Sequence, residues 1–175
     1  MALGRADLFA YFDTLGIAST TYEHRAVFTV AESHDVKAQL PGGHSKNLLL
    51  KDKKDRLFLV VAEGDAAIDL KSIHEKIGGS GRVTFAKPDV MLELLGVTPG
   101  SVTPFGLIND TEPRITVVLD EVMMRHDILN FHPLENTATT SVAAGDLIKF
   151  LRATGHEPLV VPVSNGKVVI EPTGH

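Results

Sequence analysis

Cysteine is absent from the 175 residues, so the chain has no disulfide, no thiol nucleophile and no thiolate metal ligand. It also lacks an uncharged apolar run long enough to span a bilayer, and its first seven residues do not resemble a signal peptide. These absences indicate a cytoplasmic protein with no membrane partner, which is our expectation.

Positive charge is scarce as well, since 17 Lys and Arg stand against 22 Asp and Glu, for a net charge of −5. Proteins that coat nucleic acid carry the opposite sign, so we expect no general basic surface and no DNA binding. One local cluster is the exception: Lys46, Lys51, Lys53, Lys54 and Arg56. Such a cluster fits either a solvated turn between strands or a contact with phosphate groups.

The common catalytic signatures are missing too. There is no phosphate-binding Gly-x-x-x-x-Gly-Lys-Ser/Thr loop, no Gly-x-Gly-x-x-Gly fingerprint and no His-Glu-x-x-His pair. None of the eight histidines has zinc spacing with a third obvious ligand, although His24, His34 and His44 could converge in space. We therefore expect neither a metal nor a cofactor.

The remaining composition is that of one globular domain spanning residues 1–175, without a repeat or a linker. Apolar periodicity and stop signals at Gly16, Gly78, Gly96 and Gly155 predict the helices. These helices cover residues 7–15, 29–40, 68–77, 88–95 and 141–154. Strands are predicted at residues 20–24, 47–50, 57–62, 101–108, 115–123, 158–163 and 167–170.

Two local signals support particular boundaries. Residues 29–32 have the Thr-x-x-Glu form of a capping box, and Ser141 is expected to cap the last helix. The strands at 47–50 and 57–62 are joined by a charged turn and predict a hairpin. Because strands cluster among helices without a βαβ rhythm, we predict a mixed, largely antiparallel α+β fold.

Three segments carry candidate chemistry. Lys46 stands at the mouth of an apolar strand, where its ammonium either holds a phosphate or carboxylate or extends to water. Residues 96–106, rich in Gly and Pro, form either a rigid pocket wall or a plain connection. Residues 131–141, rich in hydroxyls, either bind a substrate or serve as an elaborate helix cap.

Taken together, these segments resemble the YbaK/ProX family of aminoacyl-tRNA editing domains. The likeness rests on the run 45–52 around the lysine, on the Gly-x-x-x-Pro loop at 100–104 and on the His-Pro run at 131–137. The opening Tyr22-Glu23-His24 followed by Val27-Phe28-Thr29 is similar to the branch that clears alanine from tRNA for proline. The resemblance covers residues 5–165.

The resemblance implies a barrel-like sheet, no metal, and hydrolysis of the aminoacyl ester by water. Lys46 would then anchor the terminal phosphate or orient the ester. The substrate pocket would consist of Gly100, Ser101, Val102, Thr103, Pro104, His132, Asn136 and Thr137. The residues expected to contact tRNA are Lys51, Lys53, Lys54 and Arg56.

The expected substrate is tRNA for proline mischarged with alanine, and prolyl-tRNA synthetase is a candidate partner. A synthetase pocket for proline rejects smaller alanine weakly, because a missing methylene is worth about 1–3 kcal/mol, so a second sieve is useful. Two alternatives stay open. The chain could remove cysteine, serine or threonine with the same frame, or it could bind tRNA or a synthetase without hydrolysis.

Overall fold

The structure is a computed structural model that describes residues 2–26, 40, 42–64 and 66–168, with the backbone alone for residues 165–168. Its strands are β1 (Ser19–Glu23), β2 (Gly43–Lys51), β3 (Leu57–Glu63), β4 (Ala66–Ile68), β5 (Thr84–Phe85), β6 (Ile115–Asp120), β7 (Ile128–Phe131), β8 (Ala138–Ala143), β9 (Leu159–Val161) and β10 (Ser164–Val168). Its α-helices are α1 (Arg5–Leu15), α3 (Ile73–Ile77), α4 (Pro88–Leu95) and α5 (Ala144–Ala153). Three 3-10 turns complete the described elements: η1 (Pro99–Ser101), η2 (Pro104–Asn109) and η3 (Met123–Arg125).

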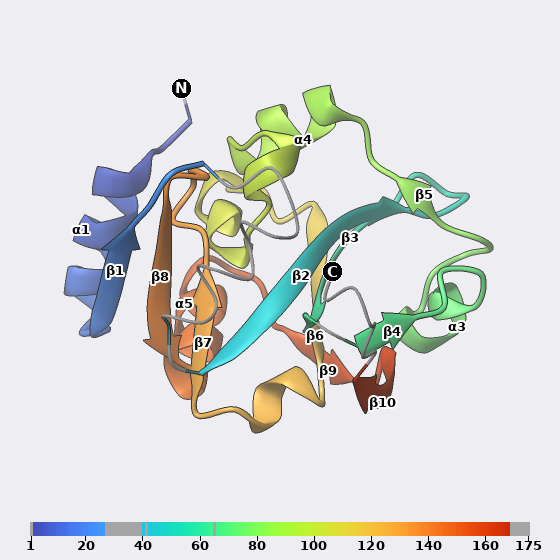
Figure 1. Cartoon of the computed structure of the whole chain (residues 1–175). Helices are drawn as coiled ribbons and strands as arrows, with labels where there is room; N and C mark the ends of the chain where they lie inside the picture. The colour runs from blue at the N-terminus through green and yellow to red at the C-terminus, as the bar shows by residue number, and fades with distance from the viewer. Residues whose placement is uncertain (1, 27–39, 41, 65, 169–175) are drawn as a thin grey trace.

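One mixed sheet forms the centre of the molecule, in the order β1-β8-β7-β2-β3-β6-β9, with β5 added beside β2. Strand β2 is the long diagonal strand of Figure 1 and joins the two halves of the sheet. It pairs in parallel with β7 at Gly43–His44 and antiparallel with β3 along Ser45–Lys51. Over the described residues the sheet is mixed, with β7, β6 and β9 each joined through a parallel pairing and the other pairings antiparallel, and it does not close into a barrel.

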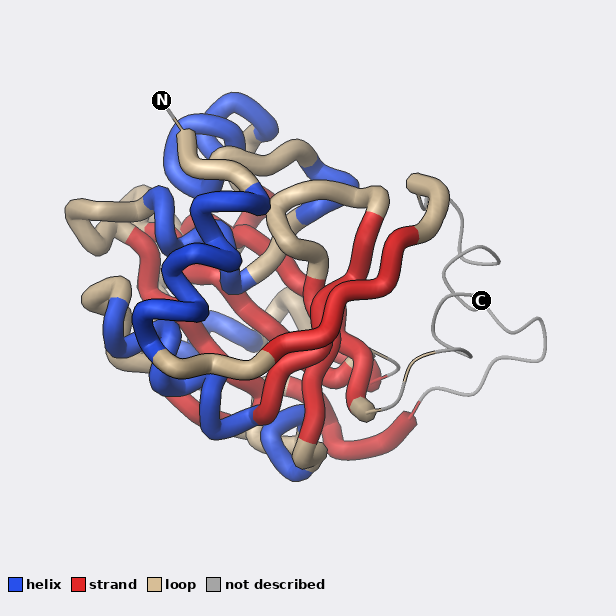
Figure 2. Tube along the Cα trace, turned by 90° about the vertical axis from the view of Figure 1, so that its left-hand side faces the viewer, coloured by secondary structure: helices blue, strands red, loops and turns tan. Residues whose placement is uncertain are grey.

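The larger hydrophobic core lies on the sheet face that is covered by α1, α4, α5 and η2. In Figure 2, which looks from the side of α1, helices gather beside the strands. Phe12, Phe105 and Phe150 meet edge to face there, with ring centroids 5.2–5.7 Å apart. Such aromatic pairs add about 0.5–1.5 kcal/mol to the burial of their surface.

A second, smaller core lies on the other face of β2, β3 and β6. Leu50, Val60 and Val118 contribute to it from the sheet, and Ile73 and Ile77 from α3. The pair β4 and β10 lies on the same side of the chain as α3 in Figure 1. Because residues alternate along a strand, the two cores share β2 but use opposite faces of it.

Several sequence predictions are confirmed. The hairpin appears as β2 and β3, the Pro-initiated helix as α4, and the first helix as α1, which ends at Gly16 with a φ of 71°. A left-handed backbone conformation at the end of a helix favours glycine, as expected. The mixed fold class is also confirmed, although the sheet is open where the resemblance implies a barrel-like one. The helix predicted at 29–40 falls almost entirely outside the described residues.

The helix predicted at 68–77 is wrong in its first half. The Asp69 carboxylate accepts hydrogen bonds from the Lys71 N–H (3.0 Å) and from the Ser72 hydroxyl (2.9 Å). This side-chain turn ends β4 at Ile68 and delays the helix until Ile73.

The strand predicted at 101–108 is wrong as well. Pro99 and Pro104 each begin a 3-10 turn, and the Thr103 hydroxyl accepts the N–H of Phe105. Proline fixes φ near the helical value and donates no N–H, so it suits the first position of such a turn. The apolar residues of this segment are buried among helices, not in a sheet.

Two boundaries also differ from prediction. Strand β6 ends at Asp120, whose buried carboxylate accepts the N–H of Glu63 (3.1 Å) and the hydroxyl of Ser164 (2.9 Å). Ser141 is no helix cap, because it lies inside β8, and the residue preceding α5 is Ala143.

Candidate functional site

A row of polar side chains occupies the face of the sheet opposite the larger core. The strand registers pair Asn130 with Ser141 and with His44, and Lys46 follows two residues along β2. Residues paired across strands share a face, and so do residues two apart in one strand. We call the set His44, Lys46, Asn130 and Ser141 the polar face.

The centre of the polar face is a buried hydrogen-bond network. The Ser141 hydroxyl donates to the Asn130 carbonyl oxygen, and the Asn130 amide donates to the Gly43 carbonyl at 3.0 Å. Asn130 and Ser141 are both buried. Buried polar groups persist when they are paired, so this network fixes how β2, β7 and β8 meet.

Lys46 is half-buried in β2, opposite Ala62 of β3. Its ammonium donates to the Ala66 carbonyl of β4 at 2.5 Å. The strand and this carbonyl fix the direction of a side chain that would otherwise be flexible. A positioned ammonium is a point charge with three donors, suited to a phosphate or to a developing oxyanion.

His132 lies just beyond β7, with its ring centroid 6.3 Å from that of His24. Its Nδ1 is 2.9 Å from the Ala138 carbonyl, and His24 Nε2 is 2.8 Å from the Thr139 hydroxyl. A carbonyl only accepts, so Nδ1 of His132 carries the hydrogen. Burial lowers the pKa of His132, the Ala138 hydrogen bond opposes this shift, and His24 adds to it. The ring is therefore neutral at pH 7, with Nε2 as an acceptor.

Within the Gly-x-x-x-Pro loop, the five predicted pocket residues differ in exposure. Gly100 is exposed, whereas Ser101, Val102, Thr103 and Pro104 are buried. The Ser101 and Thr103 hydroxyls are used in local hydrogen bonds, to the Thr98 carbonyl and from the Phe105 N–H. The loop therefore exposes its backbone at Gly100, while the other four residues are buried and support the loop from the protein interior.

Gly100 and Asn136 lie side by side although they are 36 positions apart in sequence. A Cβ at position 100 would come within 3.2 Å of the Asn136 amide nitrogen. A glycine here permits this close approach of Asn136 to the backbone. The structure thus brings together the second and third segments singled out in the sequence.

A hollow of about 340 Å³ opens beside this loop. Its lining residues come from β2, from the β5–α4 region and from the loop: Asn47, Leu48, Leu49, Phe85, Ala86, Pro88, Met91, Pro99 and Val102. This volume lies at the lower end of the range for small-ligand pockets. Of the predicted pocket residues, Val102 is the one that lines this hollow. Gly100 does not line it, so the two loop residues have different surroundings.

The turn after His132 is anchored by residues that the sequence did not single out for this role. Arg5 of α1 forms ion pairs with Glu23 of β1 (2.8 Å) and with Glu135 (2.9 Å). The Thr137 hydroxyl donates to the Glu135 carboxylate at 2.9 Å. Thr137 is thereby committed to a local contact. Local sequence gives no signal for Arg5, because its acidic partners Glu23 and Glu135 are far from it in the chain.

Strain marks the same turn. Leu134 has a φ of 70°, a left-handed backbone that residues with a Cβ rarely adopt. Strained residues of this kind gather at functional sites, where the surrounding structure holds them. Leu134 is buried, and in the sequence it stands between His132 and Asn136. Its backbone conformation therefore shapes the turn that carries both residues.

The basic turn between β2 and β3 lies at the far end of β2 from the polar face. Lys53 and Lys54 are exposed, whereas Lys51 pairs with Asp55 at 3.5 Å and Arg56 pairs with buried Asp52 at 2.9 Å. The structure does not bring these four basic residues to His132 or Gly100 through any described contact. They lie at and beyond the end of β2, on a surface separate from the polar face.

Among the described residues, no three His, Cys, Asp or Glu side chains are grouped so that they could hold a metal ion. Over the same ranges, no helix is both long and apolar enough to cross a membrane.

The polar face, the His-Pro turn and the glycine loop come from three separate runs of the sequence, and all three runs fall within the part of the chain that matches one family of known proteins. Residues 24–150 match the family model of the aminoacyl-tRNA editing domain. The chain belongs to this family, whose relatives include proteins of the YbaK/ProX type.

Two relatives show how far the likeness extends. The mouse protein named prolyl-tRNA synthetase associated domain-containing protein 1 is 38% identical over 161 residues, covering 90% of this chain and 95% of its own. The prolyl-tRNA editing protein ProX of Acetoanaerobium sticklandii is 37% identical over 150 residues, covering 85% and 91%. Both span nearly the whole of this chain.

The fold has solved counterparts as well. A crystal structure of a candidate trans-editing enzyme for prolyl tRNA synthetase superposes with a TM-score of 0.67 at 20% identity, covering 93% of this chain and 99% of that one. At this identity the likeness concerns the fold alone.

Proposed function

We propose that this protein is a trans-editing hydrolase that cleaves the ester of tRNA for proline mischarged with alanine. The observation that carries the proposal is the contact between Gly100 and Asn136 in the turn that follows His132. Membership in the editing family and the names of the ProX-type relatives support the same reading.

The chemistry requires little from the protein. Water attacks the ester carbonyl carbon, a C–O bond forms, and the bond to the ribose oxygen breaks. The ribose oxygen takes up a proton, and free alanine leaves. An aminoacyl ester is reactive enough that positioning and hydrogen bonds to the developing oxyanion supply the catalysis.

Each polar group then has a defined part. Lys46 holds the terminal phosphate or the ester, because its ammonium is directed by β2 and by the Ala66 carbonyl. His132 offers Nε2 as an acceptor for a water or for the substrate amine. Gly100 and Asn136 form the wall against the aminoacyl side chain, with Ser101, Val102, Thr103 and Pro104 supporting it. Thr137 closes the turn through Glu135.

Size selection follows from backbone rigidity. The wall at Gly100 rests on two 3-10 turns with prolines at their starts, so it has little freedom to retreat from a bulky group. Alanine fits beside such a wall, while the proline ring of the correct product meets it. This is the second sieve that a synthetase pocket for proline needs.

Contact with tRNA is assigned to the basic turn, which holds Lys51, Lys53, Lys54 and Arg56. Neutralising Lys53 and Lys54 together lowers affinity for every tRNA, because phosphate contacts carry no sequence information. A prolyl-tRNA synthetase is the proposed delivering partner.

The deciding experiment is a deacylation panel with tRNAs carrying alanine, proline, cysteine, serine and threonine. The proposal expects fast release of alanine from tRNA for proline and negligible release of proline. A preference for cysteine, serine or threonine would place the chain in a sister branch. Absence of hydrolysis with every substrate, despite binding, would make it a binding module and overturn the proposal.

A further inference from the structure

We infer that Asp120 and Ser164 are positioning residues for Lys46, and that they act by holding strand β4 in place. The inference rests on the proposed function, because it gives the two residues a part in the same deacylation. Neither residue belongs to the polar face or to the three segments that the sequence singled out. Their part follows from the group that the Lys46 ammonium contacts.

The Lys46 ammonium contacts β4. It donates to the Ala66 carbonyl at 2.5 Å, and Ala66 is itself buried. A lysine stem is flexible, so a fixed acceptor at its tip helps to decide where its charge points. A movement of the Ala66 carbonyl would therefore move the charge that the proposed reaction uses.

Strand β4 needs support from outside to hold this carbonyl still. Over the described part of the chain it has three residues and pairs with β10 alone. Figure 1 shows the two strands as a small unit beside the main sheet. Because an isolated pair of strands is marginally stable, this unit must be anchored to the rest of the molecule.

Asp120, at the end of β6, supplies the anchor. Its Oδ2 accepts the Glu63 N–H at 3.1 Å and the Ser164 hydroxyl at 2.9 Å. Glu63 is the last residue of β3 and stands three positions before Ala66. Ser164 is the first residue of β10 and pairs with Ile68 of β4. One carboxylate oxygen therefore holds both the chain that leads into β4 and the strand that lies beside it.

Burial makes this anchor firm. Asp120 is 0% exposed and Ser164 is 4% exposed, and Val163 beside it is packed into the second core. Water does not compete for hydrogen bonds at such a depth, and breaking one leaves a buried polar group unpaired. The start of β10 is therefore fixed by packing and by its hydroxyl together.

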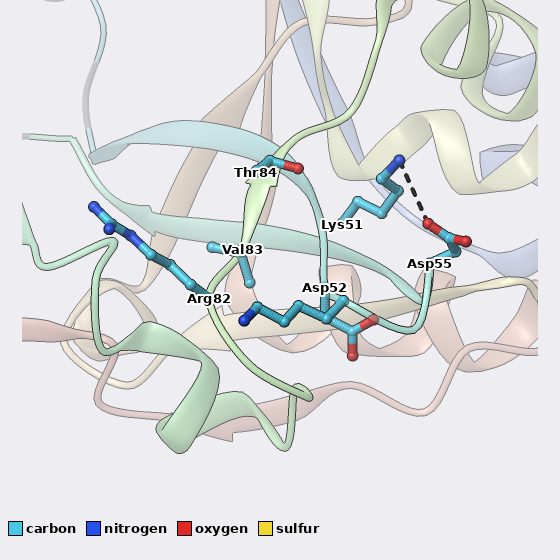
Figure 3. A pocket seen from close by; sticks show the side chains of 7 residues that line it. Lys51, Asp52, Asp55, Arg82, Val83 and Thr84 are labelled. Atoms are coloured by element: carbon cyan, nitrogen blue, oxygen red, sulfur yellow. Dashed lines mark ion pairs between the residues drawn. The ribbon is translucent and has the colours of Figure 1, made fainter.

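Asp52 offers a comparison, because it is also buried and also follows a strand, β2. Figure 3 shows it just after Lys51, in the hollow at the far end of β2 from the polar face. Its backbone donors come from the β2–β3 turn and from Ser80. Asp52 thus organises its own turn, whereas the donors of Asp120 lie on both sides of Ala66.

The first test is Ser164→Ala, which removes the hydroxyl that joins β10 to Asp120. It should lower the deacylation rate of alanyl-tRNA for proline by about five- to tenfold, because the ammonium is no longer held in position. The same substitution should cost nothing more in a Lys46→Ala background, where the residue to be positioned is gone. Thr154→Ala is the control, since it removes another part-buried hydroxyl, after α5, and should keep the wild-type rate. Thermal melting checks that each variant is folded.

Two substitutions at Asp120 separate its hydrogen bonds from its charge. Asp120→Ala loses the acceptor of both bonds and should lower the rate at least as much as Ser164→Ala. Asp120→Asn keeps one oxygen, and its amide nitrogen can take the place of Oδ1, which has no hydrogen-bond partner in the described structure. This variant should keep most of the wild-type rate, and a loss equal to that of Asp120→Ala would overturn the inference. If Asp120→Ala does not fold, Ser164→Ala and Asp120→Asn decide the question.

Nuclear magnetic resonance of protein with isotope-labelled lysine examines Lys46 without any substrate. The two hydrogens on its Cε have different shifts when the side chain is fixed and a common shift when it rotates freely. The Lys46 signal is identified by its loss in Lys46→Ala. Ser164→Ala should merge the two shifts, and Thr154→Ala should leave them apart.

A Lys46 signal that stays unchanged in Ser164→Ala would overturn the inference, whatever the rates. An equal loss of rate in the wild-type and Lys46→Ala backgrounds would overturn it too, because Ser164 would then act on another group. If the wild type hydrolyses no ester while Ser164→Ala still releases the Lys46 side chain, the proposed function fails and the positioning stands.

Discussion

His132 is held in one tautomer by the Ala138 carbonyl, and burial keeps its ring neutral. The sequence identifies this histidine only by its neighbour Pro133. Its hydrogen-bonding state depends on β8, which packs beside it. At the scale of a residue, the structure therefore adds the direction of each polar group to the residue types already visible in the sequence.

This environment predicts a pH dependence of stability. The pKa of His132 is lowered on folding, so the unfolded chain takes up a proton first as the pH falls below about 6.5. The wild type should therefore lose stability between pH 7.5 and 5.5, and His132→Gln should lose less over the same interval. Thermal melting at several pH values measures the difference. Parallel curves for the two proteins would contradict a lowered pKa.

Lys46→Ala should reduce deacylation of mischarged tRNA by at least tenfold, because the directed ammonium is lost from the polar face. The melting temperature should change little, since the side chain is only half-buried. Lys87→Ala, at an exposed lysine before α4, is the control for loss of charge. Wild-type rates for Lys46→Ala would remove this residue from the proposed mechanism.

Gly100→Ala tests the wall. The added methyl would lie 3.2 Å from the Asn136 amide, so the pocket must narrow or shift by a few tenths of an ångström. Hydrolysis of the alanyl ester should fall several-fold, and the prolyl ester should remain intact. Gly145→Ala, where a Cβ meets nothing within 4 Å, should behave as the wild type. Faster release of proline by Gly100→Ala would refute the steric reading.

At the scale of elements, the β2–β3 turn depends on one buried carboxylate. Burial by itself would raise the pKa of Asp52, but the N–H groups of Ser80, Arg56 and Lys54, together with the Arg56 guanidinium, outweigh it and lower the pKa to about 2. The ionised carboxylate therefore stabilises the folded hairpin. The sequence shows an acidic residue in a basic turn but not the donors that converge on it.

Asp52→Asn should lower the free energy of unfolding by about 2 kcal/mol, because an amide brings its own N–H groups against backbone donors. Asp55→Asn, at an exposed carboxylate of the same turn, should stay within about 0.5 kcal/mol. Urea unfolding at pH 7 distinguishes the two. The contribution of Asp52 is full above about pH 4 and is lost as the pH falls toward about 2, so the gap between wild type and Asp52→Asn should close over that interval. A constant gap would contradict the lowered pKa.

At the scale of the whole molecule, a buried pair ties the last helix to the central sheet. His156, just after α5, places Nε2 2.8 Å from the Asp110 carboxylate, and both side chains are about 1% exposed. The same carboxylate oxygen accepts the N–H groups of Arg114 and Ile115 at the start of β6. This contact links segments 46 positions apart.

His156→Ala should destabilise the fold by about 3 kcal/mol, since it empties the space of a buried ring and removes one of the three groups that contact the buried Asp110 oxygen. Arg152→Ala, which removes an exposed pair with Glu157 near the same helix end, should cost no more than about 0.5 kcal/mol. Denaturant unfolding measures both. Equal stability of the two variants would mean that the buried pair contributes little.

The sequence alone determined the features that depend on neighbouring residues. Alternating apolar residues predicted the β2–β3 hairpin, a proline and a glycine bounded α4, and three motifs indicated the family. These signals are local, because propensity, capping and turn chemistry act over a few positions. The lysine, the glycine loop and the histidine also stand in short local runs of the sequence.

Only the tertiary structure decided where those local pieces meet. The apolar run 101–108 has the composition of a strand, yet its residues pack among helices as 3-10 turns. Ser141 is a residue type that favours helix caps, yet it lies inside β8, where its hydroxyl donates to the Asn130 side chain. The contacts of Gly100 with Asn136, Lys53 with Gly81, and His156 with Asp110 join residues far apart in the chain. Local propensity is worth tenths of a kcal/mol per residue, and long-range burial and hydrogen bonding outweigh it.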